Sequence, residues 1–246
     1  MNRRIVFLHM PKCAGTSLRQ AIDSAIVQPC QDSGATVRIE TVPSATAAGL
    51  MGIDIQDFRE QLLLYHMSDP RRRFISGHVS FSERAYRQYR DDWDFITVLR
   101  HPVSRWISHY HFNRHKENSH TRITLELEEF IHSERARQLG SEYVRRLSQG
   151  LDPYADNGRA AMDMARKNLS RVALVGIVEE IENFCENFHL RYGPRLVLQR
   201  LNTNPAPDKI RRVLQDGQIL RLIENLCEPD LQIYEAAKKQ RVICDR

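Results

Sequence analysis

Residues 9–17, HMPKCAGTS, combine small, hydroxyl and basic side chains in a pattern suited to binding an anion. The segment follows a short apolar run and leads into a helical pattern, so its backbone N–H groups would lie at a helix start. Such groups are unpaired and carry the positive end of the helix dipole, which stabilises a phosphate or a sulfate. Ala and Gly allow close backbone approach, Thr and Ser add donors, and Lys adds a positive charge. The predicted anion-binding residues are Pro11, Lys12, Cys13, Ala14, Gly15, Thr16 and Ser17.

The position of the lysine separates this loop from the P-loop of nucleotide-binding proteins. In the P-loop pattern, G-x-x-x-x-G-K-[ST], the lysine follows the second glycine. Here Lys12 precedes Gly15. A simpler alternative stays open, in which Thr16 or Ser17 only caps the helix and the loop binds no ligand.

A second polar turn begins at Arg100, after an apolar strand pattern, and a proline two residues later begins a helix. Ligands of open α/β sheets bind at the carboxyl ends of strands, so Arg100 and the first loop would face one crevice if their strands are parallel. Helical spacing places Ser108 on one face with Ser104 and Arg105, where a guanidinium and a hydroxyl can share one phosphate. The alternative is that Arg100 caps a strand end and Ser108 is a surface serine.

His78 is the candidate general base, because it follows a short strand pattern in a Gly-His turn before a helix. Histidine titrates near neutrality and accepts a proton from an alcohol. The alternative is a histidine that bonds only its own loop. We interpret His9 as structural, shaping the first turn. Three other histidines, which lie near Arg100 in the chain, are rival candidates for the base: His101, His109 and His111.

These residues must be positioned by a sheet and its flanking helices. Apolar runs bounded by turns predict strands, and longer helical patterns lie between most of them, so we expect a single α/β domain with a largely parallel central sheet flanked by helices. The predicted strands are 5–8, 74–75, 95–99, 172–178 and, more weakly, 196–198. The predicted helices are 17–26, 82–89, 103–115, 125–133, 159–170, 179–192, 207–214, 218–224 and 229–242, and the predicted surface loops are 36–52 and 150–158.

The composition suits one globular domain, 1–246, that binds an anionic ligand. A chain of 246 residues that is 41% hydrophobic can bury a full core. Lys and Arg exceed Asp and Glu by 36 to 31, and the charges are interleaved, which does not favour nucleic acid. No cluster of His, Cys, Asp and Glu has metal-ligand spacing, so we predict no metal site.

The cysteines and the apolar segments indicate a cytoplasmic protein. Five scattered cysteines without a Cys-x-x-Cys pair fit a reducing compartment. The N-terminal apolar run is short, and no stretch approaches the length of about 18 apolar residues that spans a bilayer. We therefore expect no signal peptide and no membrane anchor.

The loop at residues 9–17 resembles H-x-P-K-T-A-G-T-S, the phosphosulfate loop of sulfotransferases that use 3′-phosphoadenosine 5′-phosphosulfate (PAPS). The similarity is to the branch related to heparan sulfate 2-O-sulfotransferase. It implies a P-loop-like sulfotransferase fold, PAPS as co-substrate and metal-independent transfer. Cys13 departs from the pattern, because the family has Thr there, and this replaces a hydroxyl contact by a weak thiol donor.

The same resemblance assigns roles to residues beyond the first loop. It maps the family's 3′-phosphate motif onto Arg100 and Ser108, and its G-H-V stretch, whose histidine serves the acceptor hydroxyl, onto His78. Lys12 is then a catalytic residue that stabilises the departing phosphate. A late Asn-Thr loop of the family maps onto residues 199–204, which makes Arg200 and Thr203 further cofactor contacts.

The expected function is transfer of the PAPS sulfuryl group to a hydroxyl, and we expect a carbohydrate acceptor. Arg71, Arg72 and Arg73 are candidates for binding an anionic acceptor, or else form a solvated basic turn. The alternatives are a nucleotide-dependent phosphotransferase and a non-catalytic basic domain that binds RNA or a partner.

The neighbourhood of Cys13 also leads to a prediction. Lys12 and a helix start both favour the thiolate, so we predict a lowered pKa for Cys13 and reactivity that bound ligand would block. The alternative is a small buried residue packed behind the turn.

Overall fold

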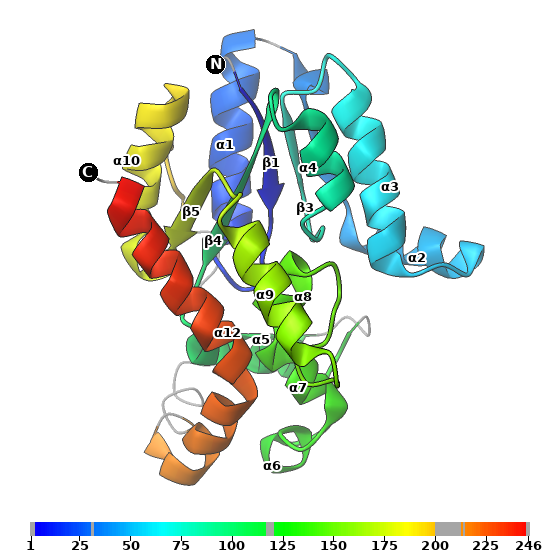
Figure 1. The fold of residues 1–246 in the computed structure, drawn as a ribbon, viewed down its shortest axis with the longest axis vertical. Helices are drawn as coiled ribbons and strands as arrows, with labels where there is room; N and C mark the ends of the chain where they lie inside the picture. Colours follow the sequence, from blue (N-terminus) through cyan, green and yellow to red (C-terminus); the bar gives the residue numbers. More distant parts are fainter. Residues whose placement is uncertain (1–2, 31, 117–120, 200–212, 214, 245–246) are drawn as a thin grey trace.

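The computed structural model describes residues 3–30, 32–116, 121–199, 213 and 215–244 (Figure 1). Within these residues the strands form one sheet in the order β2-β3-β1-β4-β5, and all neighbouring strands are parallel. This confirms the predicted α/β class with a parallel central sheet. The strands are β1 (Arg4–Leu8), β2 (Thr36–Ile39), β3 (Phe74–Gly77), β4 (Trp93–Leu99) and β5 (Leu174–Ile177).

Burial on both faces explains why the central strands are continuous apolar runs. Ile5 and Phe7 of β1 pack on one face, against α1 (Gly15–Cys30) and α10 (Ile181–Tyr192). Val6 and Leu8 point to the other face. The helices that contribute to the core on that second face are α3 (Ile55–Ser68), α4 (Glu83–Tyr89), α8 (Glu142–Leu147), α9 (Gly158–Leu169) and the second half of α12 (Gly217–Cys244).

A third apolar cluster lies beyond the carboxyl ends of the strands, at the lower end of the molecule in Figure 1. It joins α5 (Pro102–His115) to the first half of α12, with Trp106 and Ile223 fully buried. The remaining elements are α2 (Thr41–Met51), α6 (Leu127–Phe130), α7 (Glu134–Gly140) and the 3₁₀ turns η1 (Ser33–Ala35) and η2 (Val178–Glu180). Among the described helices, none combines the length and the apolar character that crossing a bilayer requires.

Several predicted elements differ from the structure. Residues 36–52, a predicted loop, form β2 and α2, because β-branched residues suit an edge strand and the Ala-rich stretch after them favours a helix. Residues 196–198 are not a strand. Residues 218–224 and 229–242, predicted as two helices, belong to the single helix α12, which continues through Pro229. The predicted helix 207–214 falls mostly outside the described residues.

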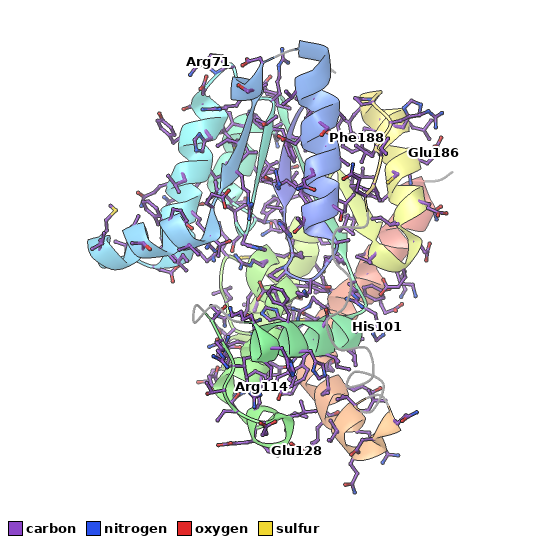
Figure 2. The ribbon with its side chains drawn as sticks, turned by 180° about the vertical axis from the view of Figure 1, so that it is seen from behind. Arg71, His101, Arg114, Glu128, Glu186 and Phe188 are labelled. Atoms are coloured by element: carbon purple, nitrogen blue, oxygen red, sulfur yellow. The ribbon has the colours of Figure 1, made fainter. Side chains whose placement is uncertain are left out.

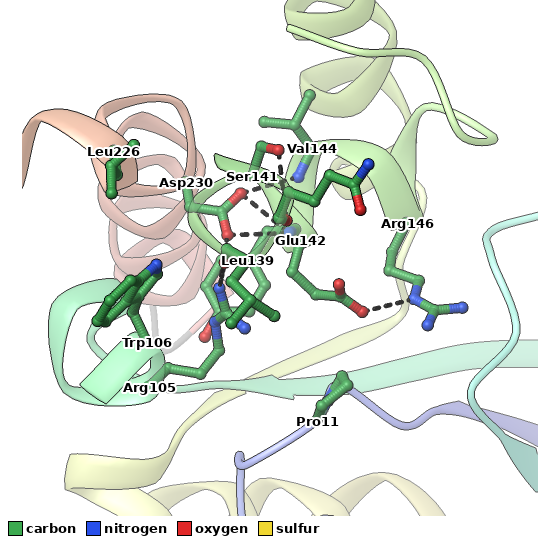
Figure 3. Close-up of polar contacts among 12 residues, drawn as sticks. Pro11, Arg105, Trp106, Leu139, Ser141, Glu142, Val144, Arg146, Leu226 and Asp230 are labelled. Atoms are coloured by element: carbon green, nitrogen blue, oxygen red, sulfur yellow. Dashed lines mark hydrogen bonds and ion pairs between the residues drawn. The ribbon is translucent and has the colours of Figure 1, made fainter. Parts of the chain in front are cut away.

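A buried ion pair holds α5, α8 and α12 together (Figure 3). Arg105 Nη2 on α5 lies 3.4 Å from Oδ2 of Asp230 on α12, and both side chains are fully buried. The same carboxylate accepts hydrogen bonds from the backbone N–H groups of Tyr143 and Val144, with distances of 2.9–3.0 Å, so it caps α8 from another helix. Arg105 also donates to the carbonyl oxygen of Leu139. The guanidinium of Arg105 is therefore held in the core, away from any ligand.

We predict that Asp230→Ala destabilises the protein by about 3 to 5 kcal/mol, since it leaves the Arg105 charge buried and two helix amides unpaired. Urea unfolding followed by circular dichroism measures this change. The control is Glu224→Ala, an exposed carboxylate on the same helix, for which we expect a change within about 0.5 kcal/mol. Equal effects of the two substitutions would contradict the structural role of Asp230.

Candidate functional site

The loop between β1 and α1 has the backbone of an anion-binding turn. Lys12 and Ala14 have positive φ angles, 64° and 54°, which residues with a Cβ rarely adopt. The first bond into the helix runs from Leu18 N–H to the Ala14 carbonyl oxygen, 3.2 Å. The N–H groups of Gly15 and the next two residues therefore have no carbonyl of an earlier turn to bind. The side chains of Ala14 and Thr16 are exposed, so the start of α1 is open to solvent.

Gly15 is required by the ring of His9. A Cβ at position 15 would lie 2.0 Å from both Cδ2 and Nε2 of His9, so the ring occupies the space of a side chain. Burial, and then the neighbouring His78, lowers the pKa of His9 to about 2, which keeps this imidazole neutral. The interpretation of His9 as the residue that shapes the turn agrees with this packing.

Two basic side chains lie near enough to influence each other at this edge of the sheet. Burial lowers the pKa of Lys12, and the nearby Arg100 lowers it further. Lys12 Nζ lies 3.9 Å from the ring centroid of Phe112 on α5. Ser108 precedes Phe112 by one helical turn, so it lies on the side of α5 that Lys12 approaches. Lys12 and Arg100 thus lie at one edge, where an anion would relieve the repulsion between them, and helical spacing puts Ser108 on the side of α5 toward Lys12.

His78 is held in the tautomer that a general base requires. Its Nδ1 lies 2.7 Å from the carbonyl oxygen of His9. A carbonyl oxygen only accepts, so Nδ1 carries the hydrogen and Nε2 keeps its lone pair. The carbonyl oxygen of His78 is itself fixed by Arg59 Nη1 at 3.0 Å and Arg146 Nη1 at 2.6 Å. Burial, and then the charge of Arg146, lowers the pKa of His78 to about 4, so the ring is neutral at pH 7.

The rival histidines differ in their surroundings. Burial, and then Arg105, lowers the pKa of His109 to about 3, and its Nδ1 is buried without a partner in the described part of the chain. The ring of His101 packs against Tyr234 of α12, with 5.5 Å between centroids. His111 is buried in the cluster of α5 and lines a separate hollow with Arg114.

Glu142 and Arg146 form an ion pair on α8 (Figure 3). The pair lies close enough to His78 and His109 to affect their pKa values. Glu142 Oε1 accepts from Arg146 Nε at 2.8 Å. Burial alone would raise the pKa of Glu142, but Arg146 and Arg105 outweigh that effect and hold the pKa at about 2. Arg59, Glu142, Tyr143 and Arg146 were not among the predicted site residues, because no local motif marks them.

Tyr143 connects the two predicted anion-binding segments. Its Oη accepts from Arg100 N–H at 2.9 Å and donates to the Arg100 carbonyl oxygen at 2.6 Å. Cys13 Sγ lies 3.3 Å from the same Oη. The loop after β1 and the turn after β4 therefore share one buried hydroxyl group.

The prediction of a reactive Cys13 thiolate is wrong. The side chain is 1% exposed and faces Tyr143 rather than the open start of α1. Burial raises the pKa of Cys13 to about 11, although the charge of Arg105 opposes this. The sequence argument used the position of the residue beside Lys12, whereas the loop backbone turns the side chain into the core.

The three arginines at 71–73 fit the alternative of a solvated basic turn. They precede β3 and so lie at the amino edge of the parallel sheet, where Ile5 N–H donates to the Arg73 carbonyl oxygen. Figure 2 shows Arg71 at one end of the molecule and His101, beside Arg100, well toward the other. Arg71 pairs with Asp69, 3.0 Å apart.

A cavity of about 680 Å³ opens beside the start of α1. Ala14 and Ser17 line it on one side, and Ile181, Cys185 and other residues of α10 line it on the other. The segment 195–199 completes the lining. Arg200 and Thr203 lie outside the described residues. Among the described residues, no group of three or more His, Cys, Asp or Glu side chains is arranged to hold a metal ion.

We predict slow alkylation of Cys13 in the native protein, at least about tenfold slower than that of half-buried Cys185, because its thiol is buried and protonated. Iodoacetamide labelling at pH 7.5, followed by mass spectrometry, measures both rates, and labelling in urea provides the control. Rapid native labelling of Cys13 would show that the loop exposes its thiol.

No protein-family model matches the chain, and no curated protein matches it. Among solved structures, the chain is similar to the crystal structure of mouse sulfotransferase SULT7A1 complexed with PAP, at 15% sequence identity and a TM-score of 0.29. The similarity covers 92% of this chain and 89% of that chain. A similarity at this TM-score assigns no function to the chain.

Proposed function

We propose that the chain is a sulfotransferase that moves the sulfuryl group of PAPS to a hydroxyl group, with a carbohydrate as the expected acceptor. The observation that supports this most is the joint placement of the open start of α1, the cations Lys12 and Arg100, and neutral His78 near one edge of the sheet. An anionic donor and a hydroxyl acceptor need these three features side by side.

PAPS would bind with its charged groups on this edge. The 5′-phosphosulfate would lie against the residues 11–17, whose amide groups at the start of α1 have no helical carbonyl to bind. The 3′-phosphate would bind Arg100 and Ser108. The cavity of about 680 Å³ beside Ala14 and Ser17 has the size of a small-molecule site and is the proposed place of the nucleoside. Arg200 and Thr203, outside the described residues, are proposed as contacts from the far side.

The transfer step needs a base and a stabilised leaving group. His78 Nε2 would accept the proton of the acceptor hydroxyl as its oxygen bonds to sulfur. The bond between sulfur and the bridging phosphate oxygen would break at the same time, and the electron pair would stay on the phosphate. The ammonium group of Lys12 would stabilise that charge. The proposal requires no metal ion.

We predict that adenosine 3′,5′-bisphosphate binds and raises the melting temperature, whereas ATP with magnesium has little effect, because Arg100 and Ser108 recognise the 3′-phosphate. Arg100→Ala should weaken binding of the bisphosphate by about 1.5 to 3 kcal/mol, as measured by isothermal titration calorimetry. The matched control is Arg71→Ala at the opposite edge of the sheet, which should bind like the wild type. Equal stabilisation by both nucleotides would favour a phosphotransferase, and no binding of either would favour a non-catalytic domain.

We predict separate effects of two substitutions on turnover, measured as transfer of radiolabelled sulfate from PAPS to a panel of sugars, polysaccharides, lipids, peptides and phenols. Lys12→Ala should depress turnover severely. His78→Ala should lower kcat by roughly 10² to 10⁴ and leave bisphosphate affinity nearly unchanged, as expected for a base. His66→Ala, a histidine near the other edge, is the control.

The pH profile gives an independent check of the base. Because His78 has a lowered pKa of about 4, it stays deprotonated as the pH falls through 6.5. The acid limb of kcat/KM should therefore lie near pH 4 instead of the usual range for histidine. Near-normal turnover of His78→Ala would place the base elsewhere.

A further inference from the structure

The sheet holds the two proposed phosphate-binding segments together only up to the ends of β1 and β4. The last paired residues are Leu8 and Thr97, and Thr97 Oγ1 donates to the Leu8 carbonyl oxygen at 2.8 Å. Beyond this point the two segments are not paired with each other, although β4 stays paired with β5 up to Leu99. Their spacing must therefore be set by other contacts.

Tyr143 makes such a contact from α8. Its Oη bonds both the N–H and the carbonyl oxygen of Arg100, at 2.9 and 2.6 Å, and lies 3.3 Å from Cys13 Sγ. The phenol hydrogen goes to the Arg100 carbonyl oxygen, and the thiol hydrogen has two acceptors within reach, Tyr143 Oη and the Pro11 carbonyl oxygen, which lies 3.6 Å from Cys13 Sγ. One hydroxyl group thereby contacts both segments.

We propose that Tyr143 is a positioning residue that sets the distance between the loop at residues 11–17 and Arg100, so that the two ends of one bisphosphate ligand are bound together. The identity of the ligand rests on the proposed function, whereas the positioning itself does not. Tyr143 bonds only the backbone of Arg100, which leaves the guanidinium for the ligand. Two bonds to one residue restrict its orientation, and a planar guanidinium needs a defined orientation to bind a phosphate with two hydrogen bonds.

Tyr143 is itself fixed by its surroundings. Its backbone N–H donates to Asp230, and its ring lies 5.1 Å from the guanidinium carbon of Arg105. The side chain is fully buried, and burial raises the pKa of Tyr143, so the hydroxyl keeps its hydrogen. The position of the hydroxyl is therefore fixed by the contacts of Tyr143 with Asp230 and Arg105, and not by the loop that it contacts.

Tyr143→Phe tests the proposal, because it removes the hydroxyl and keeps the ring. The matched control is Tyr110→Phe, a buried tyrosine on α5 whose hydroxyl donates to the Leu125 carbonyl oxygen at 3.2 Å. Without ligand, hydrogen exchange of the Arg100 amide, followed by nitrogen-15 NMR, should become at least about tenfold faster in Tyr143→Phe and stay unchanged in the control. An unchanged Arg100 amide would overturn the proposal.

A double-mutant cycle with adenosine 3′,5′-bisphosphate tests the link to Arg100. Tyr143→Phe should weaken binding by about 5- to 30-fold in the wild-type background, the range expected for a lost hydrogen bond. In the Arg100→Ala background the further loss should be less than about threefold, because Tyr143 acts through Arg100. Independent losses in the two backgrounds, or an equal loss in Tyr110→Phe, would show a general effect on stability and overturn the proposal.

The two experiments separate this inference from the proposed function. If the wild type does not bind the bisphosphate, the proposed sulfotransferase activity fails. The exchange of the Arg100 amide then still decides whether Tyr143 positions the turn. If the wild type binds and the cycle shows no coupling, the proposed function stands and the role of Tyr143 is rejected.

Discussion

The carboxylate of Asp230 is the constraint on which the arrangement of the anion-binding edge depends. It lies 87 residues after Tyr143 in the chain, yet it accepts hydrogen bonds from the first turn of α8 and pairs with Arg105 of α5. Removing it would leave a buried charge and unpaired amides, which is far more costly than losing a surface pair. α5 begins just after Arg100, and α8 carries Tyr143. The Asp230 carboxylate therefore fixes both helices next to the anion-binding edge. The exposed start of α1 therefore lies near helices whose positions Asp230 fixes.

Neutral histidines beside basic side chains define the electrostatics of this edge. Burial, and then the neighbouring basic groups, lower the pKa values of His9, His78 and His109 to between about 2 and 4. The attraction for an anion therefore comes from Lys12 and Arg100. The imidazoles remain available as hydrogen-bond partners and proton acceptors, which is a different task from charge neutralisation.

Local patterns predicted the parts of the fold and of the site that depend on local chemistry. Apolar runs identified the paired strands except β2, and helix starts such as those of α4 and α5 were predicted to within a residue or two. Strand ends indicated Lys12, Arg100 and His78 as candidates, because parallel strands bring their carboxyl ends to one edge. Tyr143 and Arg146 could not be predicted, since their roles come from contacts more than 40 residues away in the chain. The direction in which the Cys13 side chain points was predicted wrongly. That direction depends on the positive φ angles of Lys12 and Ala14, which these residue types do not indicate.

The packing of His9 against Gly15 makes these two positions a matched pair. The imidazole ring fills the volume that any larger residue at 15 would need, so neither position is free to vary alone. In homologous chains that keep this loop, an aromatic or imidazole ring at the first position should accompany glycine at the second, and loss of the ring should permit alanine. Covariation between the two sites would therefore report the geometry of the turn itself, separately from any ligand that it binds.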